Sequence, residues 1–174
     1  MSKKTDSAST DHVSRIAAQW RRETPQIALD GMNIIGRARR LTLLSRVKIE
    51  AVFARHGLDT GEFDVLATLR RCGAPFALRP TELFQTLMIS SGGLTDRLDR
   101  LDKRGLILRD ASPSDRRSVL VRLSPKGRAL IEKAFFEDMA VENELIGHLS
   151  VSEQKTLVQL LSKVLIGLEG GVAT

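Results

Sequence analysis

Hydroxyl, glycine and basic residues gather near the middle of this 174-residue chain in a pattern suited to contacting DNA. Hydroxyl groups can hydrogen-bond to base edges or phosphates, glycines let a backbone approach a duplex closely, and cations meet phosphates. The residues that we expect to contact DNA in this stretch are Ser90, Ser91, Gly92, Thr95, Arg100 and Lys103. Taken alone, the same pattern also fits an ordinary amphipathic helix with a glycine-tolerant first turn.

A second cluster of arginines lies between two β-prone runs, residues 106–109 and 119–123. Turn-forming residues separate the runs, which predicts a β-hairpin with an extended tip. At such a tip, Arg116 and Arg117 can enter a minor groove, whose negative potential attracts guanidinium groups. Asp115 can hold one of the two arginines by a charge-assisted hydrogen bond. A solvated turn is the structural alternative.

The elements that must position these groups are mainly helices. Apolar residues at helical spacing, with caps or prolines at the ends, predict helices over residues 11–23, 30–55, 60–72, 80–87, 90–104, 124–147 and 150–168. We expect the helix caps at Thr60, Ser124 and Ser150, and a short edge strand at residues 76–78. The order helix, short helix, turn, helix, hairpin is that of a winged helix-turn-helix, whose second helix lies in the major groove. The predicted fold is therefore mainly α with a small β-wing.

The chain is long enough for one sizeable core with helical extensions. We expect a disordered tail over residues 1–10, N-terminal helices for dimerisation and a possible ligand site over 11–59, a winged helix-turn-helix lobe over 60–123, and C-terminal dimerisation helices over 124–170. At ~1.5 Å per residue, a helix from Asp30 to Arg55 spans roughly 40 Å, which suits a dimer scaffold.

The net charge of +6 is unevenly distributed. Residues 1–60 and 61–130 each carry +5, whereas residues 131–174 carry −4. The positive charge of residues 1–130 favours a polyanionic partner for that part, and the negative charge of residues 131–174 indicates a different role for the C-terminal end. The alternative is that the basic side chains only form a solvated surface.

Several other classes of protein find no support in the sequence. No apolar run approaches the ~20 residues of a membrane span, and the polar first ten residues do not resemble a signal peptide. The single Cys72 favours a reducing cytoplasm. His12, His56 and His148 lack ligand-like spacing, so we expect no metal. We also find no catalytic constellation and no phosphate-binding loop, which predicts a protein that is not an enzyme and has no cofactor.

The sequence resembles the MarR family of winged-helix regulators over nearly its whole length. The motifs that carry the resemblance are Pro80-Thr81-Glu82-Leu83, Arg97-Leu98-Asp99-Arg100-Leu101, Gly105-Leu106-Ile107, Asp115-Arg116-Arg117 and Leu123-Ser124-Pro125-Lys126-Gly127. The resemblance implies a homodimer that is joined by its N- and C-terminal helices. It also implies a transcriptional regulator, a repressor in our interpretation, that binds a pseudo-palindromic DNA operator and is released by a small ligand.

A finer resemblance is to the urate-responsive, PecS-type subgroup, carried by residues 61–66, by residues 90–95 and by the leading helix with its tryptophan. It implies ligand-binding roles for Trp20, Asp64, Arg97 and Arg109. The Trp20 indole offers a face on which a ring can stack, and the guanidinium groups of Arg97 and Arg109 attract an anion, whereas the Asp64 carboxylate repels an anion. Thr24 stands where some members have arginine, so we expect an anionic aromatic or carboxylate ligand, urate-like molecules included. The structural alternative makes Trp20 a core aromatic and pairs Asp64 with Arg97.

Two alternative functions stay open. A redox sensor of the same fold would use Cys72, although the chain has no tyrosine to activate it and we interpret it as a buried structural thiol. A winged-helix module that binds another protein, without DNA or effector, is the second alternative. Binding to random duplex at low salt separates it from a DNA-binding regulator.

Overall fold

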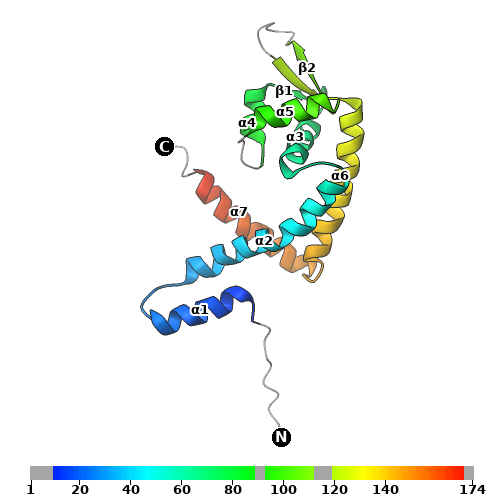
Figure 1. Ribbon diagram of the computed structural model, residues 1–174. Coiled ribbons are helices and arrows are strands. Elements are labelled where there is room, and N and C mark those ends of the chain that lie inside the picture. The colour runs from blue at the N-terminus through cyan, green and yellow to red at the C-terminus, as the bar shows by residue number, and fades with distance from the viewer. Residues whose placement is uncertain (1–9, 89–92, 112–118, 171–174) are drawn as a thin grey trace. The chain divides into compact units, whose positions relative to one another are not determined.

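The computed structural model describes residues 10–88, 93–111 and 119–170, in two compact units that meet between Lys48 and Ile49. Its elements are α1 (His12–Glu23), α2 (Asp30–Arg55), α3 (Thr60–Arg71), β1 (Ala77–Leu78), α4 (Pro80–Thr86), α5 (Leu94–Lys103), β2 (Ile107–Ala111), β3 (Val119–Leu123), α6 (Pro125–Ile146) and α7 (Val151–Gly170) (Figure 1). The predicted class, mainly α with a small antiparallel sheet, is confirmed. Within the described ranges, no helix is long and apolar enough to cross a membrane.

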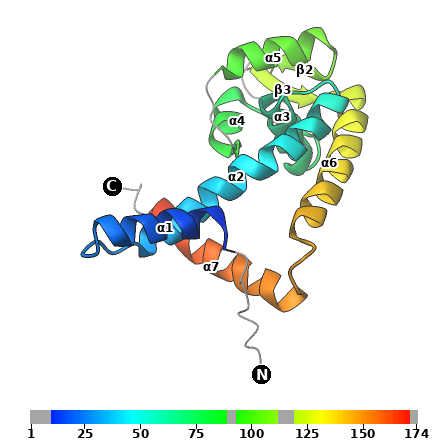
Figure 2. The ribbon, with the colours of Figure 1, turned by 60° about the horizontal axis from the view of Figure 1, so that its bottom comes forward.

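The first unit consists of α1 and most of α2, which run side by side (Figure 2). A Cβ atom built at Gly36 would lie 3.2 Å from Cγ1 of the buried Val13, so the missing side chain lets the two helices approach closely. Arg37 on α2 reaches across to the N-terminal end of α1, where its Nη2 lies 2.8 Å from Asp11 Oδ2. The charged pair and the small glycine together hold this helical hairpin.

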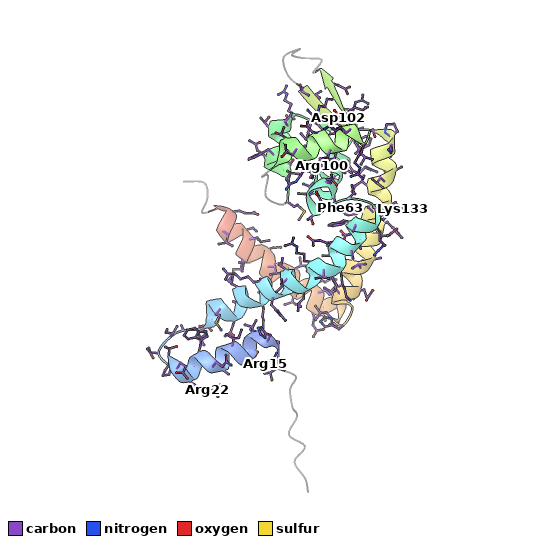
Figure 3. All side chains as sticks on the ribbon, in the orientation of Figure 1. Arg15, Arg22, Phe63, Arg100, Asp102 and Lys133 are labelled. Atoms are coloured by element: carbon purple, nitrogen blue, oxygen red, sulfur yellow. The ribbon has the colours of Figure 1, made fainter. Side chains whose placement is uncertain are left out.

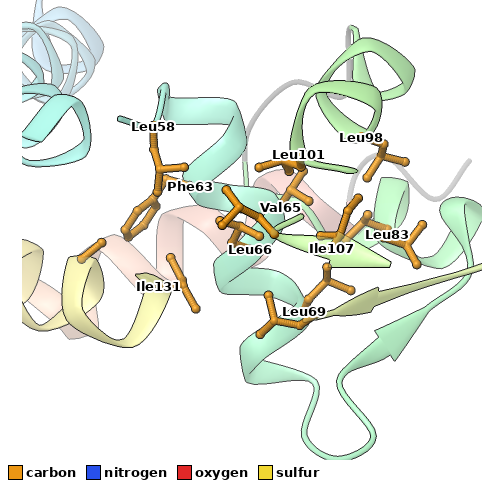
Figure 4. Close-up of a cluster of buried hydrophobic side chains, with 14 of the residues drawn as sticks. Leu58, Phe63, Val65, Leu66, Leu69, Leu83, Leu98, Leu101, Ile107 and Ile131 are labelled. Carbon is orange, nitrogen blue, oxygen red and sulfur yellow. The ribbon is translucent and has the colours of Figure 1, made fainter. Parts of the chain in front are cut away.

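The core of the second unit is organised around α3, which packs against α4, α5, β3 and α6. Its most deeply buried large side chains include Leu66, Leu69, Leu83, Leu101, Ile107 and Ile131. Phe63 extends from α3 toward Ile131 on α6, and its ring stacks on Phe53 with 3.9 Å between the centroids (Figure 3, Figure 4). Burial of these aliphatic and aromatic groups is the main force that holds the helices on the small sheet.

The sheet has the strand order β1-β3-β2, and both pairings are antiparallel. Ile107 pairs with Leu123 at the base of the β2–β3 hairpin, and Ala77 of β1 pairs with Arg122. The predicted hairpin and the predicted edge strand are therefore confirmed. The hairpin tip, residues 112–118, lies outside the described residues.

The helix starts agree with the sequence at three places and differ at two. The Ser124 hydroxyl accepts a hydrogen bond from the Gly127 amide at 2.9 Å, and the Ser150–Glu153 capping box is present, both as predicted. Pro80 opens α4, also as predicted.

The two differences concern α3 and α5. Asp59 caps α3 instead of Thr60, because its carboxylate accepts the Glu62 amide at 2.7 Å while Glu62 Oε2 accepts the Asp59 amide at 3.1 Å. Helix α5 begins at Leu94, later than the predicted Ser90 or Ser91, because Gly93 before it adopts the left-handed φ of 72°.

Candidate nucleic-acid interface

Helix α5 is the element expected to read DNA, and one face of it is fixed to the core. Leu94, Leu98 and Leu101 are all buried, as their spacing predicted. The remaining positions of α5 are polar or charged, and Thr95 is exposed in its first turn. The helix therefore presents its N-terminal polar groups outward on a rigid base, as a recognition helix requires.

The structure describes only some of the residues that we expect to touch DNA. Thr95 lies exposed near the start of α5, and Lys103 lies exposed at its end. Arg100, on the same helix, is also described. The other members of the predicted set are Ser90, Ser91, Gly92, Asp115, Arg116 and Arg117, and all of these lie outside the described residues.

A hollow of about 470 Å³ lies beside Thr95, between α4 and α5. Thr81, Phe84 and Gln85 of α4 line it together with Thr95 and Asp96 of α5. Phe84 is 55% exposed, which is unusual for a phenylalanine on a helix next to a core. An exposed ring and an amide beside Thr95 could contact a thymine methyl group and a base edge. Sequence reasoning missed both side chains, although Phe84 directly follows the inward-facing Leu83.

Arg100, which is labelled on α5 in Figure 3, forms ion pairs with two carboxylates of its own chain. Its Nη2 lies 2.8 Å from Asp59 Oδ2 and its Nε lies 3.0 Å from Glu62 Oε1, while Arg104 Nη1 lies 3.2 Å from Glu62 Oε2. The hydrogen bond that Arg100 donates to the Glu62 carboxylate is the main cause that raises the pKa of Arg100. This network ties α5 to the first turn of α3, and the phosphate contact expected of Arg100 stays a prediction.

The two acidic partners in this network were not predicted as functional. Glu62 is only 6% exposed in its side chain, so its charge depends on the two arginines and on the Asp59 amide for stabilisation. The available signal was the Asp-x-x-Glu capping box, Asp59 to Glu62, which places a carboxylate at a helix start. Nothing in the spacing indicates that Arg100, 41 residues away from Asp59, would reach it.

Three of the four predicted ligand-binding residues lie in the second unit. Asp64 on α3 is buried, and its Oδ2 accepts a hydrogen bond from the Met88 amide at 2.9 Å. Arg97 on α5 is half-buried and lies against Gly61 at the start of α3. Arg109 on β2 forms ion pairs with Asp99 and Asp102 of α5, the second with 3.6 Å between its Nε and Asp102 Oδ2.

Trp20, the fourth predicted ligand-binding residue, belongs to the first unit and lies on α1. It is 49% exposed, so the alternative that made it a core aromatic is wrong for this structure. Its indole is available to solvent, as a stacking face for a ligand must be.

Cys72 lies at the C-terminal cap of α3 and is exposed, so the prediction of a buried thiol is wrong. Partial desolvation raises the pKa of this thiol. A raised pKa lowers the fraction of reactive thiolate, which disfavours the redox-sensing alternative. In the part of the chain that the structure describes, no group of three or more histidine, cysteine or acidic residues could hold a metal ion.

Comparisons with known proteins agree with this geometry. The model of the MarR family matches residues 58–119. The HTH-type transcriptional regulator PecS of Dickeya dadantii (strain 3937) is 40% identical over 152 residues, which cover 87% of this chain and 92% of PecS.

Two solved structures are similar in fold. A structure of Bordetella bronchiseptica BpsR, which concerns regulation of its DNA binding by 6-hydroxynicotinic acid, matches with a TM-score of 0.68 and 26% identity over 79% of this chain and 96% of that one. A MarR family regulator from Streptomyces coelicolor in complex with DNA matches with a TM-score of 0.71 and 21% identity, over 82% of this chain and 89% of that one.

Proposed function

This chain belongs to the MarR family of DNA-binding transcriptional regulators, and we propose that it is a homodimeric repressor released from a pseudo-palindromic operator by a small anionic ligand. The observation that carries the proposal is α5, a helix fixed by three buried leucines that presents Thr95 outward just before an antiparallel hairpin. In this assignment α5 enters the major groove, and Arg116 and Arg117 enter the adjacent minor groove.

Exposed apolar side chains support the proposed dimer. No residue of α7 is buried, and its large exposed apolar residues are Val151, Leu157, Val158, Leu160, Leu161, Val164, Leu165, Ile166 and Leu168. The exposed apolar residues of α2 include Ile34, Leu41, Leu44 and Val47. Apolar surface of this extent favours burial against a second copy. We propose that residues 11–59 and 124–170 form the dimer interface and that residues 60–123 form the DNA-binding lobe, with the two α5 helices ~34 Å apart.

The proposed ligand is an aromatic or carboxylate anion that binds Trp20, Asp64, Arg97 and Arg109. Support comes from Arg109, which bonds to Asp99 and Asp102 on α5. An anion that takes Arg109 away from these carboxylates would release one attachment of the recognition helix, and Arg97 on the same helix would be drawn toward the anion as well. BpsR adds support, because 6-hydroxynicotinic acid is an aromatic carboxylate. A tenfold loss of DNA affinity requires only ~1.4 kcal/mol of differential binding.

The experiment has two stages, both on the full-length protein. Fluorescence anisotropy first measures binding to operator DNA and to random duplex at low and high salt, where a regulator binds both at low salt and a protein-interaction module binds neither. Urate, 6-hydroxynicotinate and salicylate are then titrated while the fluorescence of Trp20, the single tryptophan, and DNA release are followed together.

Two variants test the site itself. Arg97→Ala removes one cation, and Asp64→Asn removes a charge while keeping an oxygen that can accept from the Met88 amide. Both should change the ligand concentration needed for release by tenfold or more. Equal release from wild type and from both variants would exclude these residues as the sensor.

A further inference from the structure

The second unit contains a cavity of about 810 Å³ between α3 and α6. Its size lies within the range of roughly 300–1,000 Å³ typical of small-molecule sites. Most of its wall is apolar, and the side chains that form this part include Phe53, Phe63, Met88, Ile131, Phe135 and Met139. A hydrophobic molecule with one or two rings would bury its surface well against these residues.

One wall residue, Asp138 of α6, does not fit an apolar lining. It is only 3% exposed, and its Oδ1 has no hydrogen-bond partner among the described residues. Buried polar atoms are nearly always hydrogen-bonded, and a buried carboxylate is costly unless it is paired. Oδ1 of Asp138 therefore lacks a hydrogen-bond donor among the described residues, and because Asp138 lines the cavity, a ligand bound there is the group that could supply one.

The other charged groups of the cavity leave Asp138 uncompensated. Arg70 Nε lies 2.7 Å from Glu132 Oε1, and Arg71 donates to the Thr86 carbonyl, so each cation has its own acceptor. Asp64 accepts from the Met88 amide. Glu142 follows Asp138 by one helical turn and lines the same cavity, which places two carboxylates close together. Burial, with a smaller contribution from Glu142, raises the pKa of Asp138 to about 6.

We propose that this cavity binds an aromatic cation, whose ammonium group pairs with Asp138 while its ring packs among the phenylalanines of α3 and α6. The ammonium group would supply the missing donor and relieve the repulsion between Asp138 and Glu142. The aromatic walls would add cation–π attraction. This ligand is opposite in charge to the anion proposed above, and of the residues proposed to bind that anion only Asp64 lines this cavity, so the proposal does not depend on that response.

The test uses two probes with the same ring and opposite charge, tryptamine and indole-3-propionate. Isothermal titration calorimetry at pH 7.5 measures the binding of each to the full-length protein, to Asp138→Asn and to Glu144→Gln. Glu144 is exposed on the same helix and does not line the cavity, so its substitution is a matched control for the loss of one negative charge. We expect tryptamine to bind wild type and Glu144→Gln equally, and Asp138→Asn at least tenfold more weakly.

Indole-3-propionate should show the reverse order, with weak binding to wild type and tighter binding to Asp138→Asn. Lowering the pH from 7.5 to 5 should weaken tryptamine binding to wild type and leave the Asn variant nearly unchanged, because only wild type loses the Asp138 charge. Equal tryptamine affinities for wild type and Asp138→Asn would overturn the proposal. So would the absence of any tryptamine binding, the result expected if a second copy of the chain fills the cavity.

Discussion

The guanidinium group of Arg97 lies directly over the backbone of Gly61. A Cβ atom built at Gly61 would come within 2.2 Å of Arg97 Nε and 2.5 Å of its Cζ, so any larger residue must displace the arginine. Gly61 lies in the first turn of α3 and Arg97 belongs to α5. The absence of a side chain at Gly61 therefore allows Arg97, a cation of the proposed ligand site, to lie at this position.

Gly61→Ala should therefore change ligand response more than stability. Arginine is flexible and can move aside, while alanine favours a helix by ~0.5–1 kcal/mol over glycine, so the two effects on unfolding oppose each other. We expect a small change in Tm and at least a fivefold shift in the anion concentration that releases DNA. Thermal unfolding and operator-binding anisotropy measure the two quantities.

Gly31→Ala is the matched control, because nothing lies within 4 Å of a Cβ at that helical position of α2. It should leave the ligand response unchanged. A Gly61→Ala protein that also responds like wild type would show that the position of Arg97 does not matter to the sensor.

Glu62→Gln should destabilise the second unit clearly. Glu62 accepts from the Asp59 amide and pairs with both Arg100 and Arg104, so a neutral glutamine would lose two charge-assisted hydrogen bonds at a buried position. We expect a loss of ~2 kcal/mol in the free energy of unfolding. Urea denaturation measures this loss.

Glu82→Gln provides a close comparison. Glu82 is also the third residue of a helix and accepts the Arg79 amide at 2.7 Å, but it is exposed on α4. Its substitution should cost less than ~1 kcal/mol. Equal losses in the two variants would mean that capping alone, without the arginines, accounts for the role of Glu62.

The parts of this site that sequence could predict are those set by local spacing. Leu94, Leu98 and Leu101 recur at helical intervals, and Ser124 precedes a proline at a helix start, so each could be assigned from its neighbours alone. The β2–β3 hairpin could likewise be predicted, because two β-prone runs are separated by turn-forming residues.

The contacts that were missed join residues far apart in the chain. Asp59 and Arg100 are separated by 41 positions, and the cavity around Asp138 forms only when α6 packs on α3. Spacing carries no information on such contacts, because they depend on how whole helices pack. The start of α5 was missed for a different reason, since glycine permits helical and left-handed backbone alike and Gly93 adopts the left-handed one.

Gly127→Ala should be among the most damaging single changes in the second unit. A Cβ atom at this buried position would lie 2.0 Å from the backbone oxygen of Leu106, which cannot move without disturbing its bond to the Ser124 amide. We expect a loss of about 3 kcal/mol or more in the free energy of unfolding. Gly167→Ala, where nothing lies within 4 Å, should be neutral or slightly stabilising in the same denaturation experiment.

Asp138→Asn should stabilise the protein in alkaline solution and not in acid. The pKa of Asp138 is raised from 3.8 to about 6, so the folded state binds this proton more tightly than the unfolded chain does. The contribution of Asp138 to the free energy of unfolding therefore rises as the pH falls from about 7 to 4. Above pH 6 the buried carboxyl is ionised, and its charge destabilises the folded state most. Asparagine removes that cost, on the order of 1–3 kcal/mol at pH 8. Unfolding curves at pH 8 and pH 4.5 measure the difference, and an advantage that is equal at both would contradict the assignment.

Lys103→Ala and Arg100→Ala should separate DNA contact from helix anchoring. Lys103 is exposed at the end of α5, and among the described residues it takes part in no ion pair, whereas Arg100 is bound to Asp59 and Glu62. If Lys103 meets a phosphate, its loss should lower the slope of log affinity against log salt by ~0.9 for each contact removed and leave Tm unchanged. Arg100→Ala should lower Tm as well, because the buried Glu62 loses one of its two cations. Affinities at four salt concentrations, together with thermal unfolding of both variants, decide the outcome. A salt slope that Lys103→Ala leaves at the wild-type value would remove Lys103 from the phosphate contacts, and an unchanged Tm in Arg100→Ala would show that this arginine does not anchor α5.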